Sequence, residues 1–129
     1  MAMINIDGKT HDGEQLSDAS KAHVQSIQFI DNWISKLLSE SAVCQTARNA
    51  YGEALASLLP PPAHPNKKKG VLTVDGKKYA LDDMSAEAKA QLQSLQFVDA
   101  KLRDLESERA VLSTARNAYA QALKVALDA

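Results

Sequence analysis

Two arginine and tyrosine pairs are the residues best suited to bind a ligand. The string TARNAY occurs twice, and its arginines and tyrosines are Arg48, Tyr51, Arg116 and Tyr119. In a helix, residues three apart lie on the same face, so each guanidinium is expected to stand beside a phenol. A guanidinium binds phosphate and carboxylate groups through several charge-assisted hydrogen bonds. These four residues are therefore the candidate site for a small anionic ligand.

The other reactive side chains form no recognisable catalytic or metal site. His11, His23 and His64 lack the spacing of metal ligands and fall in three different predicted elements. Cys44 aligns with a leucine in the internal repeat described below, which indicates a packing position rather than a nucleophile. The carboxylates follow the surface spacing of helices and identify no acid and base pair. We therefore expect no enzymatic activity, no metal and no cofactor.

The charge balance gives no reason to expect a nucleic-acid or membrane partner. The 15 lysines and arginines nearly cancel 16 aspartates and glutamates, which leaves a formal net charge of -1. Lys67, Lys68 and Lys69 form a basic run, but without interleaved aromatic residues a solvated linker explains it better. No apolar run approaches the roughly 20 residues of a membrane span, and the start MAMINIDGK lacks a signal-peptide pattern. A reducing, cytoplasmic compartment is expected, which also suits a single cysteine.

The sequence repeats itself at an offset of 68 residues. Aligning residues 4–59 with residues 72–127 needs no gap, and about 25 of the 56 aligned pairs are identical. We predict a tandem duplication with repeat 1 at residues 1–59, a proline- and lysine-rich linker at residues 60–70, and repeat 2 at residues 71–129.

Each repeat is predicted to form a short β-hairpin followed by one long helix. Hairpins are expected at residues 3–12 and 71–82, because Asp-Gly suits the two positive-φ positions of a type I′ turn. Each helix is expected to begin beside a serine that can cap it, and the expected ranges are 17–59 and 85–127. Only 5 glycines and 5% aromatic residues are typical of a helix-rich chain. The predicted fold class is mainly α.

Apolar residues recur along both predicted helices at alternating steps of three and four, which is the spacing of a coiled-coil seam. In the first helix the positions are Ile27, Ile30, Ile34, Leu37, Ser41, Cys44, Arg48, Tyr51, Leu55 and Leu58. In the second helix they are Leu95, Val98, Leu102, Leu105, Arg109, Leu112, Arg116, Tyr119, Leu123 and Ala126. A helix of roughly 40 residues needs a partner, and the two seams supply each other with one.

The direction of pairing follows from charge and linker length. A parallel pair would set Arg48 against Arg116 and would require the linker to return along a whole helix while also folding a hairpin. An antiparallel coiled coil needs neither, so it is the predicted arrangement. Its register places Arg48 near Asp99 and Arg116 near Asp31.

A second apolar stripe falls outside this seam and forms the candidate partner interface. Its residues, with Trp33 beside them, are Phe29, Val43, Phe97 and Val111. A second copy of the chain can cover the stripe and make a four-helix bundle, or another protein can do so. The third alternative is that each helix breaks into two, with Asp31-Asn32 as the candidate break.

The motifs of the second repeat resemble a known family. They are the DGK turn at residues 75–77, the LQFVD segment at residues 95–99 and the TARNAY element at residues 114–119. The strings look like a small family of uncharacterised bacterial and bacteriophage proteins that usually carry one such unit. The first half departs from it at His11, Gly13 and Cys44. The resemblance implies a bacterial or phage setting, hence the cytoplasm of a bacterial host cell, and no catalytic or binding residue.

Two functions are open from the sequence. The leading hypothesis is a non-enzymatic helical interaction or assembly module, such as a phage or bacterial accessory factor, an assembly chaperone or an inhibitor. Its partner is another protein, a second copy of the chain, or both. The alternative is a protein that binds or sequesters an anionic nucleotide or metabolite between the repeats through Arg48 and Arg116.

Overall fold

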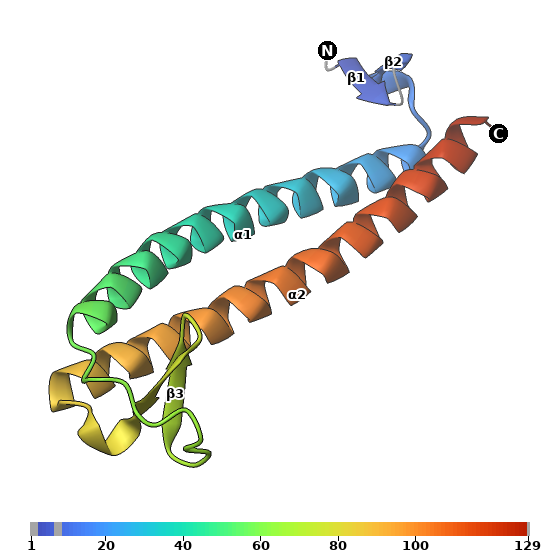
Figure 1. Ribbon diagram of the computed structural model, residues 1–129. Helices are drawn as coiled ribbons and strands as arrows, with labels where there is room; N and C mark the ends of the chain where they lie inside the picture. The colour runs from blue at the N-terminus through green and yellow to red at the C-terminus, as the bar shows by residue number, and fades with distance from the viewer. Residues whose placement is uncertain (1–2, 7–8, 129) are drawn as a thin grey trace. The chain divides into compact units, whose positions relative to one another are not determined.

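The computed structural model of the chain describes residues 3–6 and 9–128 (Figure 1). The elements follow one another as β1 (Met3–Ile6), β2 (Lys9–Asp12), the 3-10 turn η1 (Gly13–Gln15), α1 (Asp18–Ser57), β3 (Val71–Val74), β4 (Lys77–Ala80), the 3-10 turn η2 (Leu81–Asp83) and α2 (Ala86–Asp128). The prediction of a mainly helical protein with two long helices and two small hairpins is confirmed.

Each hairpin is a two-stranded antiparallel sheet. In the second one, Val71 pairs with Ala80 and Val74 pairs with Lys77. Asp75 and Gly76 have φ angles of 50° and 79°, so both turn residues are in the left-handed region, as the Asp-Gly prediction required. The corresponding Asp7-Gly8 turn lies outside the described residues.

The second hairpin is slightly shorter than the predicted range of residues 71–82. β4 ends at Ala80, and Leu81 begins the turn η2 instead of continuing the strand. Its amide donates to the carbonyl of Gly70, and its side chain packs against a cluster formed by Leu55, Met84 and Ala88. The chain turns here because Leu81 can then be buried against the helices rather than exposed at a strand end.

Serine hydroxyls cap both helices. The Ser17 hydroxyl accepts a hydrogen bond from the Ser20 amide at 3.1 Å, and the Ser85 hydroxyl accepts one from the Ala88 amide at 3.0 Å. α1 ends at Ser57, two residues before the predicted end, because proline at residue 60 disfavours helical backbone at the residue before it. Both helices are continuous, so the alternative of a break at Asp31-Asn32 is wrong.

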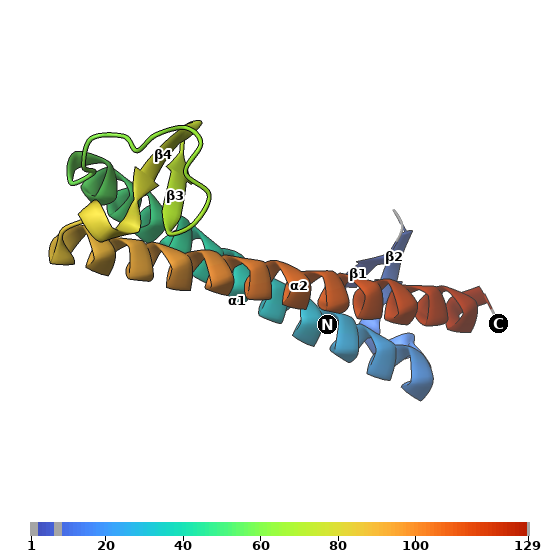
Figure 2. The same ribbon diagram turned by 60° about the horizontal axis from the view of Figure 1, so that its bottom comes forward.

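The chain forms two compact units that do not coincide with the two sequence repeats. Unit 1 consists of Met1–Glu40 and Leu105–Ala129, and unit 2 is the intervening stretch Ser41–Asp104. Each unit therefore contains one hairpin, one segment of α1 and one segment of α2. Within each unit the two helical segments lie side by side and run in opposite directions (Figures 1 and 2).

Each unit buries apolar side chains from both helical segments. In unit 1 the buried apolar residues are Val24, Ile30, Leu37, Leu105, Leu112 and Leu123. In unit 2 they are Leu55, Ala80, Met84, Ala88 and Val98. Most of these helical residues occupy predicted seam positions. Within residues 3–6 and 9–128, no helix carries an apolar stretch long enough to cross a membrane.

Candidate functional site

The arginines of the two TARNAY strings each form an ion pair with an aspartate of the other repeat, and each unit contains one of these pairs. In unit 2, Arg48 Nε donates a hydrogen bond to Asp99 Oδ1. In unit 1, Arg116 donates to both oxygens of Asp31, with 3.1 Å between its terminal nitrogen and Asp31 Oδ2. The hydrogen bond from Arg116 to Asp31 raises the pKa of that guanidinium. The predicted cross-pairing of the two arginines with the two aspartates is confirmed.

The tyrosines of the candidate anion site do not join these ion pairs. Tyr51 is half-buried, and Tyr119 is exposed with its ring centroid 6.3 Å from that of His23. Within the described part of the chain, neither phenol is hydrogen-bonded to an arginine. Because a carboxylate already neutralises each guanidinium, an anionic ligand would have to compete with Asp31 or Asp99 for it.

A cavity of about 260 Å³ lies beside the ion pair of unit 1. The wall residues come from β1 and both helical segments: Ile4, Asn5, Val24, Ile27, Gln28, Asp31, Arg116, Ala120 and Leu123. The wall is mixed in polarity, and its two charged groups form a neutral pair. The geometry also shows that β1 covers the flank of the helices that carries Asp31.

We expect the ion pairs to stabilise the fold modestly. In a double-mutant cycle, Arg116→Ala and Asp31→Ala should show a coupling of about 0.5–1 kcal/mol, since both side chains remain more than 40% exposed to solvent. Urea unfolding of the wild type, the two single variants and the double variant measures this coupling.

Inorganic phosphate serves as the ligand control for the same site. A rise in melting temperature on adding phosphate, abolished by Arg116→Ala, would favour the anion site and contradict a purely structural pair.

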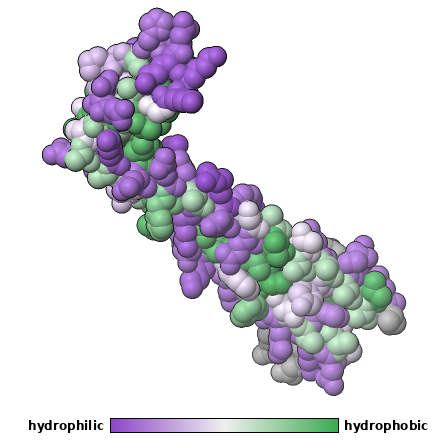
Figure 3. Space-filling model, turned by 90° about the horizontal axis from the view of Figure 1, so that it is seen from below, coloured by the Kyte–Doolittle hydropathy of each residue, from purple (hydrophilic) through white to green (hydrophobic). Residues whose placement is uncertain are grey.

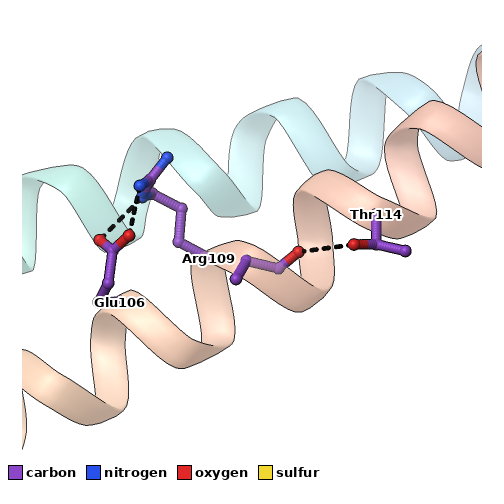
Figure 4. Close-up of polar contacts among 4 residues, drawn as sticks. Glu106, Arg109 and Thr114 are labelled. Carbon is purple, nitrogen blue, oxygen red and sulfur yellow. Dashed lines mark hydrogen bonds and ion pairs between the residues drawn. The ribbon is translucent and has the colours of Figure 1, made fainter.

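Arg109 forms an ion pair that the sequence did not reveal. Its guanidinium donates to both oxygens of Glu106, one turn earlier on the same helix, with 3.1 Å between Nε and Oε2 (Figure 4). This contact lowers the pKa of Glu106 and raises that of Arg109. In the same view Thr114 donates to the carbonyl of Ala110 at 3.1 Å. The charge of Arg109 is therefore neutralised by a carboxylate of the same helix.

The Glu106–Arg109 pair should give a small acid dependence. Because the pKa of Glu106 is lower in the folded chain than its ordinary value of 4.5, its contribution is fully present above pH 4.5 and is lost as pH falls through the folded pKa. Glu106→Gln should therefore reduce the melting temperature slightly at pH 7. Melting curves from pH 7 to pH 3 should show that the difference shrinks with acid; a difference that grows would contradict this assignment.

The predicted interface residues are all exposed. The exposed fractions are 65% for Phe29, 39% for Trp33, 70% for Val43, 72% for Phe97 and 68% for Val111. Large apolar side chains on a surface at such fractions usually mark an interaction site when they gather on one face. Figure 3 shows hydrophobic residues reaching the surface among hydrophilic ones along the helices.

Phe29 and Trp33 form the wall of a groove in unit 1. Their rings meet edge to face, with centroids 5.9 Å apart and planes at 78°. The groove has a volume of about 630 Å³, and its other lining residues are Ala22, Gln25, Ser26, Ile30, Leu112, Ala115 and Tyr119. This groove was not predicted from the sequence, although a phenylalanine followed four residues later by a tryptophan on one helix face was a visible signal.

The remaining reactive side chains do not converge. Cys44 is half-buried, His23 packs near Tyr119, and exposed His64 accepts a hydrogen bond from the Asn66 amide. Across the residues that the structure describes, no three potential ligands among histidine, cysteine, aspartate and glutamate come together for a metal ion. Lys67 and its neighbours are exposed, and the ammonium of Lys78 donates to the Lys67 carbonyl, which ties the linker to β4.

Comparison with known proteins gives one match. No curated protein and no solved structure matches the chain. Residues 61–129, which contain β3, β4, η2 and all of α2, match a family of unknown function, DUF6447. The match covers more than half of the sequence, so the chain belongs to the DUF6447 family of unknown function.

Proposed function

We propose that this protein is a non-enzymatic interaction module that binds a helical protein surface through an apolar face in each unit. We call these surfaces the open faces. In unit 1 the open face comprises Phe29, Trp33 and Val111, and in unit 2 it comprises Val43 and Phe97. The observation that carries the proposal is the exposure of these large apolar side chains.

The hairpins leave the open faces uncovered because they pack on a different flank. At about 100° per residue, Phe29 lies about 160° around α1 from Asp31, whose flank β1 covers. In unit 2, Leu72 of β3 and Leu92 of α2 pack against the same buried cluster, and Phe97 follows Leu92 by five residues, or about 140° around α2. The hairpin in each unit therefore cannot shield the open face of that unit.

The pairing of the helices as an antiparallel coiled coil is part of the same proposal. Burial at the seam positions Ile30, Leu37, Leu105 and Leu112, together with the two cross-pairs of arginine and aspartate, supports it. We also propose that the chain arose by tandem duplication of one hairpin-plus-helix unit, since both repeats have the same order of elements. A bacterial or phage accessory role in the cytoplasm fits such a small module.

Partner capture with matched variants tests the proposed function. The tagged chain is expected to retain a protein from a lysate of its source organism, and the double variant Phe29→Glu with Phe97→Glu is expected to lose it. Leu38→Glu is the control, because Leu38 is 54% exposed but follows Asp31 by seven residues and so lies on the other flank. Equal capture by all three proteins would show that the open faces do not bind.

The anionic-ligand alternative has weaker support. Arg48 and Arg116 are both engaged by carboxylates, and the tyrosines of the same strings lie apart from them. The cavity beside Arg116 is the one feature that favours a small ligand there. A rise in melting temperature with inorganic phosphate that Arg116→Ala abolishes would support this alternative.

A further inference from the structure

We propose that the partner of the open faces is a second copy of this chain, which docks face to face to form a helical bundle. This inference rests on the proposed function, since it names the occupant of the same surfaces.

Both open faces contain one phenylalanine and one valine, although the two helices supply them in opposite order, and unit 1 adds Trp33. Unit 1 presents Phe29 from α1 and Val111 from α2, whereas unit 2 presents Val43 from α1 and Phe97 from α2. A two-fold dimer brings the same surface of both copies together, so that surface must be able to pack against a copy of itself. Phenylalanine and valine meet this requirement, because apolar side chains gain from contact with one another whichever copy supplies them.

Small residues surround these large side chains and allow a second helical layer to approach closely. The exposed or half-buried alanines near the open face of unit 1 are Ala22, Ala115 and Ala118, and those of unit 2 are Ala47, Ala50 and Ala90. Helices pack with axes about 8–10 Å apart when ridges of large residues enter grooves lined by small ones. The groove beside Phe29 and Trp33 has alanine on both of its helical walls and provides such a recess.

The apolar area that the two open faces expose together is a large part of the area that a dimer buries. At roughly 200 Å² for a whole aromatic side chain, Phe29, Trp33 and Phe97 present about 350 Å². Val43 and Val111, which are 70% and 68% exposed, bring the total to on the order of 500 Å². A stable dimer buries about 800 Å² per partner, which the alanines and aliphatic stems of neighbouring residues can supply.

The charges on these faces suit self-association better than a strongly charged partner. Lys36 and Glu40 follow Phe29 and Trp33 by seven residues in unit 1, and Lys101 and Asp104 lie beside Phe97 in unit 2. Within the described part of the chain, these four charged groups make no ion pair. A face that carries both signs avoids repulsion from its own copy and can pair lysine with carboxylate across the interface.

Sedimentation equilibrium of the purified chain tests the inference. The wild type is expected to have about twice the 13.9 kDa chain mass, and Phe29→Glu with Phe97→Glu is expected to have the monomer mass while keeping its helical circular dichroism. Phe97→Ala, which adds no charge, should raise the dissociation constant about tenfold or more. Leu38→Glu, on the other flank, should remain a dimer.

Two results would overturn self-association through the open faces. One is a wild-type chain that stays a monomer at the highest concentration reached; the other is a dimer that survives both open-face substitutions. If the chain is a monomer but the open-face variants still lose a captured protein, the interaction function stands with a different partner. If neither self-association nor face-dependent capture is found, both proposals fail.

Discussion

Leu123→Ala is expected to lower the free energy of unfolding by about 2–5 kcal/mol. Leu123 is 2% exposed, and its neighbours at the cavity of unit 1 include Val24, Ile27 and Ala120. The substitution removes buried methyl groups and enlarges a cavity that is already present, so the surrounding side chains cannot close around the loss. Since small domains are stable by only about 5–15 kcal/mol, urea unfolding should show a large shift in midpoint.

Leu38→Ala is the matched control for this experiment. It makes the same chemical change within the same unit, but Leu38 is 54% exposed, so the expected effect is within about 0.5 kcal/mol. The contrast between the two leucines isolates burial from helix propensity. Equal losses at Leu123 and Leu38 would mean that Leu123 does not lie in a packed core.

The sequence predicted the elements well because their signals are local. Serines placed at the helix starts, an Asp-Gly pair at the second turn and a continuous pattern of threes and fours each depend on neighbouring residues alone. The cross-pairs were also predictable, because aligning the centres of two antiparallel helices places each arginine near an aspartate of the other repeat. Arg48 with Asp99, and Arg116 with Asp31, then follow from register.

The compact units were not predictable from the repeat. Sequence similarity groups residues 1–59 and residues 71–129, whereas the structure joins Met1–Glu40 with Leu105–Ala129. The reason is physical: a long helix with an apolar seam cannot bury that seam against its own short hairpin. Each helical segment is therefore buried against a segment of the other repeat, and compactness follows these contacts rather than sequence similarity.

Two features of the candidate site were not predicted, because they depend on which conformation a side chain adopts. Arg109 occupies a predicted seam position, yet its guanidinium donates to Glu106 on the same helix. A carboxylate one turn away is close enough to bind the guanidinium in place of a group on the other helix. The groove formed with Phe29 and Trp33 depends likewise on how two rings stack, which residue spacing does not specify. Exposure of the second stripe, by contrast, was expected from helical spacing.

Ala88→Leu is expected to lower the free energy of unfolding by about 1–3 kcal/mol. Ala88 is fully buried and lies between Leu55 and Met84 in the cluster that joins the second hairpin to the helices. Three added heavy atoms have no space there, so side chains or backbone must shift. Thermal and urea unfolding measure the loss, and Ala56→Leu, at an exposed position of α1 in the same unit, should cost almost nothing.

Ser20 provides an independent check, because it stands at the position of repeat 1 that aligns with Ala88 and is only 1% exposed. Its hydroxyl accepts a hydrogen bond from Ser17, and Ser20→Ala removes both the polar group and its need for a partner, so a change within about 1 kcal/mol is expected. Ser20→Leu should instead be as destabilising as Ala88→Leu. A tolerated leucine at either position would show that the helices do not approach closely there, and that the small residue is not required by packing.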